Sequence, residues 1–225
     1  DMDGTLAEFR HVDQLETLYE PGYFANLRPM DKVVKAVREI HANHPEIEVH
    51  ILSAYLSDSP HALVEKNQWL DQPLPEIDTA HRVFVPCGVD KKEYVPGGIR
   101  PDDYLLDDYT HNLSLWEPPA RGIKLMNGIN HTKGTWQGDR IRFDHDPAKL
   151  ADKIVSVMKG QAQIYDPAPS KEEGDAYSLG VRTAQEIMRA GYQPYYNKGN
   201  LHIFQNPKTG GFQFYAVSFR KDRPG

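Results

Sequence analysis

Asp1-Met2-Asp3-Gly4-Thr5 is the segment from which the fold of this chain can be predicted. Alternate side chains of an extended segment point the same way, so Asp1 and Asp3 can face one small site. Gly4 allows the backbone to turn directly after them. One carboxylate can attack phosphorus and hold the phosphoryl group, while the other handles the proton of the leaving group. The segment therefore indicates a phosphatase, although five residues also fit a calcium-type loop or an acidic turn.

Three later apolar runs, each expected to form a strand, lead to reactive polar residues. The runs and their endpoints are Val49-His50-Ile51-Leu52 ending at Ser53, Arg82-Val83-Phe84-Val85 leading to a loop with Lys91 and Lys92, and Tyr104-Leu105-Leu106 ending at Asp107 and Asp108. A helical pattern that opens at Asp31 precedes the first of these runs, and another that opens at Ser59-Pro60 separates the first run from the second. This alternation predicts an α/β fold with a Rossmann-like parallel sheet, in which ligands bind at the carboxyl ends of the strands.

The chain divides into a core, a linker and an appendage in this interpretation. We expect a hydrolase core at 1–160, with a small helical cap at about 7–30 after the first motif, and a last helix that opens at Asp146-Pro147 and is capped by Gly160. A linker is predicted at 161–174. A small α+β appendage should follow at 175–225, with a helical stretch at 175–190 and a hairpin around Asn206–Gly211. An apolar strand is expected upstream of Asp1, because such a strand needs about five or six residues.

Composition excludes several classes of function. The 225 residues contain 26 basic and 32 acidic side chains, a formal charge of −6, and no basic run, so nucleic-acid binding is not indicated. No apolar run reaches membrane-spanning length, so no membrane interaction is predicted. The single Cys87 rules out an internal disulfide framework and suits a reducing, cytoplasmic location, and nothing adjacent marks it as an activated thiol.

Carboxylates gathered at one site would repel each other and a phosphate dianion unless a cation intervened. The predicted ligands of that cation are Asp1, Asp3, Asp107 and Asp108. Mg²⁺ is the expected cofactor, because it takes oxygen ligands and leaves places for water and a substrate phosphate. Asp3 could contribute its main-chain carbonyl, which leaves its side chain available as acid and base. Had it stood alone, the pair Asp107-Asp108 would be interpreted as a solvated turn.

Ser53, together with the adjacent Ala54, is the predicted phosphate-binding segment. A serine hydroxyl can donate to a phosphoryl oxygen, and a lysine can neutralise the charge on the equatorial oxygens. Lys91 is preferred for that lysine, and Lys92 remains the alternative. Phe9, Tyr23 and Phe24 fall in or near the cap and could stack on a nucleobase, although aromatic residues at such positions also commonly form the core of a small domain.

These motifs, in this order, resemble those of the haloacid-dehalogenase-like hydrolases. Within that superfamily the chain is similar to the cytosolic type C 5′(3′)-deoxyribonucleotidases over roughly residues 1–145. The segments that carry the similarity are Asp1-Met2-Asp3-Gly4-Thr5-Leu6-Ala7-Glu8-Phe9, Pro21-Gly22-Tyr23-Phe24-Ala25-Asn26-Leu27-Arg28-Pro29 and Asp107-Asp108-Tyr109-Thr110-His111-Asn112-Leu113. The cap interval is short for the family, and residues 161–225 have no counterpart in the similarity.

The resemblance implies a role for each matched residue. Asp1 would be the nucleophile, Asp3 the acid and base, and Asp107 a magnesium ligand. Ser53 and Lys91 would bind phosphate, and Phe9 would contact the base.

The sequence thus predicts a magnesium-dependent hydrolase of nucleoside 5′-monophosphates, with deoxyribonucleoside forms as the expected substrates, that works through an aspartyl phosphate. Two alternatives stay open: a phosphatase for sugar or other small phosphates, and a catalytically idle interaction module. A homodimer, and a protein partner for the C-terminal module, are left open as well.

Overall fold

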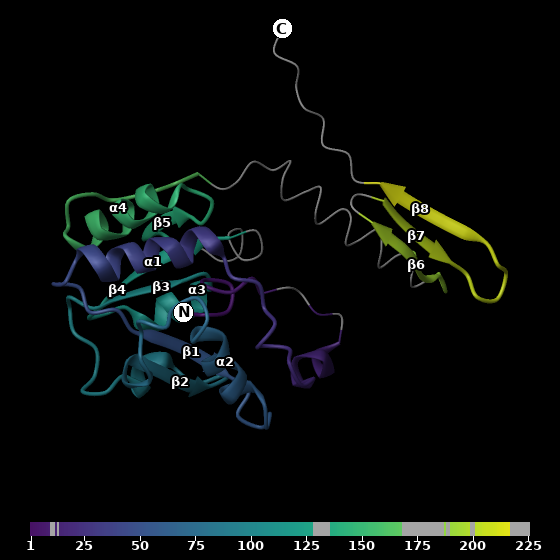
Figure 1. The fold of residues 1–225 in the computed structure, drawn as a ribbon. Helices are drawn as coiled ribbons and strands as arrows, with labels where there is room; N and C mark the ends of the chain where they lie inside the picture. The colour runs from purple at the N-terminus through teal and green to yellow at the C-terminus, as the bar shows by residue number, and fades with distance from the viewer. Residues whose placement is uncertain are drawn as a thin grey trace, which may run out of the picture. The chain divides into compact units, whose positions relative to one another are not determined.

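The computed structural model describes residues 1–9, 12, 14–127, 136–167, 187, 190–198 and 201–216. The chain divides into two compact units, Asp1–Ala168 and Pro169–Gly225. Each unit is described by itself (Figure 1).

Parallel strands form the centre of the first unit. Strand β1 (Ile51–Tyr55) pairs with β2 (Arg82–Pro86), and a second sheet has the order β3 (Tyr104–Asp107), β4 (Arg121–Met126), β5 (Asp139–Arg142). The main-chain nitrogen of Asp1 donates to Leu106 O at 2.8 Å, which places the first motif beside β3. The predicted α/β architecture with parallel strands is therefore confirmed.

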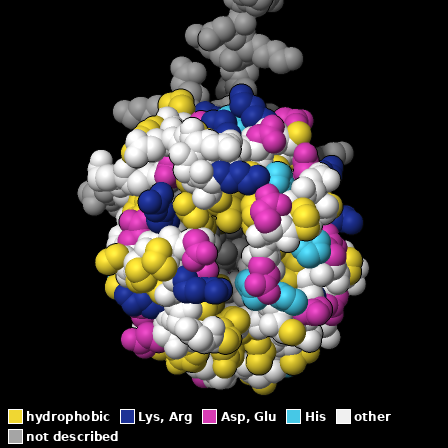
Figure 2. Space-filling model, turned by 90° about the vertical axis from the view of Figure 1, so that its left-hand side faces the viewer, with side chains coloured by type: hydrophobic (Ala, Val, Ile, Leu, Met, Phe, Trp, Pro, Cys, Tyr) yellow, Lys and Arg dark blue, Asp and Glu magenta, His cyan; other side chains and the backbone are white. Residues whose placement is uncertain are grey.

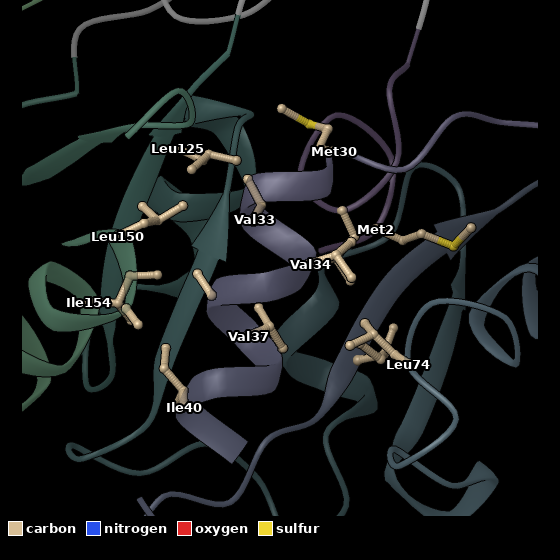
Figure 3. Close-up of a cluster of buried hydrophobic side chains, with 14 of the residues drawn as sticks. Met2, Met30, Val33, Val34, Val37, Ile40, Leu74, Leu125, Leu150 and Ile154 are labelled. Carbon is tan, nitrogen blue, oxygen red and sulfur yellow. The ribbon is translucent and has the colours of Figure 1, made fainter. Parts of the chain in front are cut away.

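Helices cover both faces of these strands. Helices α1 (Asp31–Asn43) and α4 (Pro147–Met158) pack side by side, and α2 (Ala62–Leu70) contributes to the same core. Figure 3 shows α1 in this core, with Val33 on the side of Leu125 and Leu150 and Val34 turned toward Met2. Helix α3 (Thr110–Trp116) packs on β3 and β4 in a separate apolar cluster that includes Leu105.

The two strongest helix predictions are confirmed. Helix α1 begins at Asp31, and its predicted apolar face is buried: Val33, Ala36, Val37 and Ile40. Helix α4 follows Asp146, whose side chain accepts a hydrogen bond from Ala148 N at 3.1 Å. Gly160 lies two residues beyond α4 with a φ of +65°, a left-handed conformation that ends the helix at low steric cost.

Two predicted boundaries were wrong. Strand β1 begins at Ile51 and continues past Ser53 to Tyr55, because its ladder with β2 extends to the pair Tyr55 and Pro86. Ser53 therefore lies inside the strand rather than at its end. Helix α2 begins at Ala62, not at Ser59-Pro60, because the Ser59 hydroxyl accepts the main-chain N–H groups of His61 and Ala62, each at 3.3 Å, ahead of the helix.

The cap segment, residues 7–30, contains little regular structure in its described part. Its helix is a single 3-10 element, η1 (Leu15–Tyr19), followed by turns at 21–26. A bridge between Ala7 and Pro29 joins the two ends of the cap segment. The cap segment therefore leaves the core and returns to it at neighbouring points.

The stretch after α4 is bound to the edge of the first unit. Arg140 N donates to Ile164 O at 2.7 Å, and Asp166 N donates to Arg140 O at 3.0 Å. The Asp166 carboxylate also accepts hydrogen bonds from Arg142 N at 3.0 Å, from the His145 ring at 2.6 Å and from Lys153. The first part of the predicted linker, 161–167, thus extends along β5, and residues 168–174 lie outside the described part.

We expect a chain that ends at Pro167 to keep the stability of the first unit, and a chain that ends at Gln161 to lose it in part. The shorter chain removes the Asp166 carboxylate and leaves partly buried partners without their charged acceptor, a loss of about 1.5–3 kcal/mol per hydrogen bond. Thermal unfolding of both chains measures the difference. Asp166→Asn is the matched control, because it removes the same charged acceptor without shortening the chain. Equal melting temperatures for the two truncated chains would contradict the account.

The second unit contains an antiparallel sheet of β6 (Gln193–Lys198), β7 (Leu201–Gln205) and β8 (Phe212–Ala216). Asn206 initiates the turn between β7 and β8, since its side-chain oxygen accepts hydrogen bonds from Lys208 N at 2.9 Å and Thr209 N at 3.2 Å. The predicted hairpin is confirmed. The predicted helical stretch at 175–190 lies almost wholly outside the described residues.

The molecular surface carries charges of both signs. On the face drawn in Figure 2, acidic, basic and histidine side chains are interspersed with apolar ones. Within the described ranges, no helix has the length and apolar character needed to cross a membrane.

Candidate active site

The first predicted carboxylate, Asp1, lies beside the end of β3. Lys91 joins it to that strand: Lys91 Nζ is 2.8 Å from Asp1 Oδ1 and 2.7 Å from Asp107 Oδ2. The Lys91 side chain is 4% exposed and that of Asp107 is fully buried, so water screens these charges only weakly. The structure therefore brings together three predicted site residues that are up to 106 positions apart in the sequence.

Local hydrogen bonds fix the orientation of the two carboxylates after β3. Asp107 accepts from Tyr109 N at 2.8 Å and from Asn112 Nδ2, on α3, at 3.0 Å. Asp108 accepts from Asn127 Nδ2 at 2.8 Å, and the same amide donates to Gly4 O at 2.7 Å. Asn127, which follows β4, thus links the second acidic pair to the first motif.

Gly4 is required by its surroundings as well as by its backbone. Its φ of +79° lies in the left-handed region, and a Cβ added there would meet the Asp108 carboxyl group, with Cγ only 2.7 Å away. The predicted turn after Asp3 is therefore confirmed. It brings the backbone of the first motif against Asp108.

A second lysine, Lys66 on α2, was not predicted. Its side chain is fully buried, and its ammonium group donates to Asp3 Oδ2 and, at 3.3 Å, to Ser53 Oγ. Ser53 is itself fully buried. The structure thus brings Asp3 and Ser53 together through a lysine, with Ala54 next to Ser53 on β1.

The adjacent lysines after β2 point in different directions. Both belong to the 3-10 helix η3 (Lys91–Tyr94), where successive side chains diverge. While Lys91 reaches the carboxylates, Lys92 Nζ donates to Leu115 O at 2.6 Å. The structure therefore places Lys91, and not Lys92, among the candidate site residues.

The aromatic residues of the cap segment differ in exposure. Phe24 is 4% exposed, its ring meets Tyr23 edge-on at 5.0 Å, and the Lys66 ammonium lies 4.9 Å from its centroid. Phe24 is thus a packed neighbour of Lys66. Phe9 and Tyr23 are only partly buried.

Helix α2 also fixes the position of the cap segment. The buried Glu65 carboxylate accepts hydrogen bonds from the main-chain nitrogens of Gly22 at 2.6 Å, Phe24 at 3.0 Å and Ala25 at 3.4 Å. Glu65 directly precedes Lys66 in the chain. One helical turn therefore positions both the cap segment and an ammonium group of the candidate site.

The acidic residues of this site suit a magnesium ion. Asp1, Asp107 and Asp108 each offer a carboxylate oxygen, and these atoms lie within 4.8 Å of one another. Asp3 Oδ1 is buried and has no hydrogen-bond partner among the described residues. Magnesium prefers such oxygen donors. Carboxylates gathered this closely repel one another, which favours a bound cation.

Two neighbouring groups have altered acidity. Burial lowers the pKa of Lys124, on β4, against the opposing effect of the Asp108 and Asp107 carboxylates, and its ammonium group bonds the Thr110 hydroxyl. Desolvation raises the pKa of the Cys87 thiol, which reduces its thiolate fraction. This agrees with the prediction that Cys87 is not a nucleophile.

The chain is similar to known proteins over the part that carries this site. Residues 2–142 match the family model described as 5′ nucleotidase, deoxy (Pyrimidine), cytosolic type C protein. A Staphylococcus epidermidis protein named "Putative 5′(3′)-deoxyribonucleotidase" is 28% identical over 127 residues, 56% of this chain and 62% of that protein. A Staphylococcus aureus protein of the same name is 32% identical over 115 residues, 51% of this chain and 57% of the relative.

A human relative, "5′(3′)-deoxyribonucleotidase, cytosolic type", is 30% identical over 121 residues, which are 49% of this chain and 60% of the human protein. The chain therefore spans about three fifths of the length of the curated relatives it matches. The matched part includes the residues of the candidate site after Asp1.

Proposed function

Because the chain belongs to the cytosolic type C family of deoxy (pyrimidine) 5′ nucleotidases, we propose that it is a phosphoric monoester hydrolase acting on nucleoside 5′-monophosphates, preferably deoxy forms. The observation that carries the proposal is the buried arrangement of Asp1 and Asp107 around Lys91. Nucleophile and charge-stabilising groups are thereby held together before substrate arrives, as phosphoryl transfer requires.

Two ammonium groups and one strand would hold the phosphate. Lys66 supplies positive charge next to Asp3, and Lys91 supplies it next to Asp1. Ser53 would donate its hydroxyl, and the main chain of the adjacent Ala54 would line the same pocket. Equatorial oxygens that gain charge in the transition state would then face fixed donors.

Asp1 and Asp3 would divide the chemistry between them. A carboxylate oxygen of Asp1 attacks phosphorus, the phosphorus–ester oxygen bond breaks, and Asp3 gives its proton to the leaving alkoxide. Asp3 then takes a proton from water, whose oxygen attacks the aspartyl phosphate. The acyl phosphate bond breaks, phosphate leaves, and the Asp1 carboxylate is restored.

Magnesium is the proposed cofactor. Asp1, Asp107 and Asp108 would hold it, with the main-chain carbonyl of Asp3 as a further donor. When bound, it would neutralise phosphate oxygens and acidic side chains that otherwise repel the substrate. Asn112 and Asn127 would keep Asp107 and Asp108 oriented.

Phe9 and Tyr23 are the proposed contacts of the nucleobase, since both rings are partly exposed. Phe24, buried against Lys66, would act in the same pocket by supporting the phosphate-binding ammonium group. The name of the human relative, which is of the cytosolic type, supports a cytoplasmic location.

A substrate panel tests this function. Phosphate release should require magnesium, stop with excess chelator, and be faster on deoxyribonucleoside 5′-monophosphates than on sugar phosphates. Phe9→Ala should remove that preference, because base stacking is worth about 1–3 kcal/mol, or about ten- to a hundredfold. Rates on p-nitrophenyl phosphate, which has no base, are the control for Phe9→Ala.

Each rival function has its own result in that panel. Equal wild-type rates on nucleotides and sugar phosphates would favour a general small-phosphate phosphatase. No release from any ester would favour an idle interaction module, which would act by pairing with a second copy of the chain or by binding a protein through the second unit.

Lysine substitutions test the phosphate site separately. We expect Lys66→Met and Lys91→Met each to lower kcat/KM by about 10²-fold, the usual cost of removing a donor to a developing oxyanion. Lys92→Met is the matched control and should stay near the wild-type rate, because Lys92 bonds the carbonyl of Leu115 instead. Steady-state kinetics on one nucleotide give the comparison. A larger loss for Lys92→Met than for Lys91→Met would reverse the assignment.

A further inference from the structure

A cluster of two histidines and a glutamate lies at the amino ends of β1 and β2. Glu48 and His50 are two residues apart and their ligand atoms lie close together, while Val49 between them packs on the core. His81 directly precedes β2. Because Ile51 pairs with Arg82, His50 and His81 precede paired residues of neighbouring parallel strands.

The donor atoms are spaced as metal ligands are. Glu48 Oε1 is 3.3 Å from His50 Nε2 and 3.4 Å from His81 Nε2. Zinc–ligand bonds of about 2.0–2.1 Å at tetrahedral angles put neighbouring ligand atoms about 3.3 Å apart. The potential ligand atoms of the three residues all lie within 4.8 Å of one another.

A neighbouring carboxylate fixes the orientation of one imidazole. Asp78 Oδ1 lies 2.6 Å from His81 Nδ1 and also accepts the main-chain N–H groups of Ala80 at 3.0 Å and His81 at 3.2 Å. Because a carboxylate can only accept, Nδ1 of His81 is the donor to Asp78, and in the neutral ring the Nε2 lone pair then faces the cluster. Metal-binding histidines commonly have such a carboxylate partner.

Ion pairing alone explains this arrangement poorly. Glu48 Oε1 contacts both Nε2 atoms, and a pair of salt bridges would require both rings to be protonated. The ring centroids are only 4.9 Å apart, so two imidazolium ions would repel each other. A shared divalent cation would satisfy both neutral rings and the carboxylate at once.

We propose that Glu48 Oε1, His50 Nε2 and His81 Nε2 form a surface site for a divalent transition-metal ion, with zinc as its best probe. Imidazole and carboxylate donors suit zinc, and three protein ligands leave a fourth position for water. The site is at the opposite ends of the strands from Asp107 and binds across the β1–β2 pair. Its occupancy should therefore stabilise the strand pair independently of phosphate chemistry.

Calorimetric titration of the full chain with zinc chloride, in excess magnesium, is the direct test. The titration is run at a pH of about 7.5, above the ordinary imidazole pKa of about 6.5. The wild type should show a saturable site and a higher melting temperature with zinc. His50→Ala and His81→Ala should each remove both effects, and Asp78→Asn should weaken binding about 10- to 100-fold.

His44→Ala is the matched control. His44 also pairs with a glutamate, Glu46 at 3.3 Å, but belongs to no three-donor group in the described part of the chain, so its loss should leave zinc binding unchanged. The proposal fails if the wild type does not bind zinc, or if the variant lacking both His50 and His81 binds it equally well. An equal loss in His44→Ala would also overturn it, since the ion would then be shared among surface histidines.

Discussion

Asp1→Asn is expected to abolish turnover on every phosphate ester, because an amide cannot form the aspartyl phosphate. The substitution keeps the size of the side chain, and Lys91 retains its partner Asp107 at 2.7 Å, so the fold should remain. Phosphate release by the variant measures the effect, with mass spectrometry to exclude deamidation back to aspartate. Thermal unfolding checks that the fold is kept.

Asp102→Asn is the matched control for that substitution, because Asp102 is an exposed aspartate outside the candidate site. It should retain the wild-type rate. A near-normal rate for Asp1→Asn, with deamidation excluded, would contradict covalent catalysis by Asp1.

The second large effect is expected for Asp3→Asn. Loss of the acid and base should lower kcat on nucleotides by about 10²- to 10⁴-fold. The leaving group of p-nitrophenyl phosphate needs no proton, so its first turnover should stay fast while hydrolysis of the intermediate becomes slow. Rapid-mixing measurements should therefore show a burst of nitrophenol followed by a slow phase.

Lys66 should keep its position in the Asp3→Asn variant, so that the variant tests the proton-transfer role of Asp3 rather than substrate binding. Its ammonium group also contacts Ser53, so it keeps a polar partner when the Asp3 carboxylate is replaced. Substrate binding should then change little. Slow formation of nitrophenol without a burst would show that Asp3 contributes to the first step by more than proton donation, against the assigned role.

Much of the acidic site could be predicted from the sequence because its members stand in short motifs. Asp1 and Asp3 share a local turn, and Asp107 and Asp108 follow an apolar strand. Local spacing is enough to place such groups at a sheet edge. The main-chain bond between Asp1 and Leu106 then sets the two motifs side by side.

Lys66 could not be predicted in the same way. In the sequence it is one polar residue on a weakly amphipathic helix, and long charged residues on helices usually face solvent. Its burial depends on the tertiary packing of α2 against Asp3 and Ser53, 63 and 13 positions away. The one sequence feature that could have indicated it is the position of Lys66 among the weakly periodic apolar residues of this helix.

Asn127 was missed because β4 was missed. The strand Arg121–Met126 carries Lys124 in its centre, which interrupts the apolar run that marks a buried parallel strand. The choice between Lys91 and Lys92 likewise needed the geometry of η3. Adjacent residues of equal chemistry cannot be distinguished by composition.

The most direct test of the central claim is to find the phosphoryl group on Asp1. Asp3→Asn is mixed with phosphorus-labelled p-nitrophenyl phosphate and magnesium, quenched in acid during the slow phase, and digested for mass spectrometry. The account predicts label on the peptide that contains Asp1, and none when Asp1→Asn is added to the same variant. Rapid nitrophenol release in Asp3→Asn without label on Asp1, or label on another residue, would contradict it.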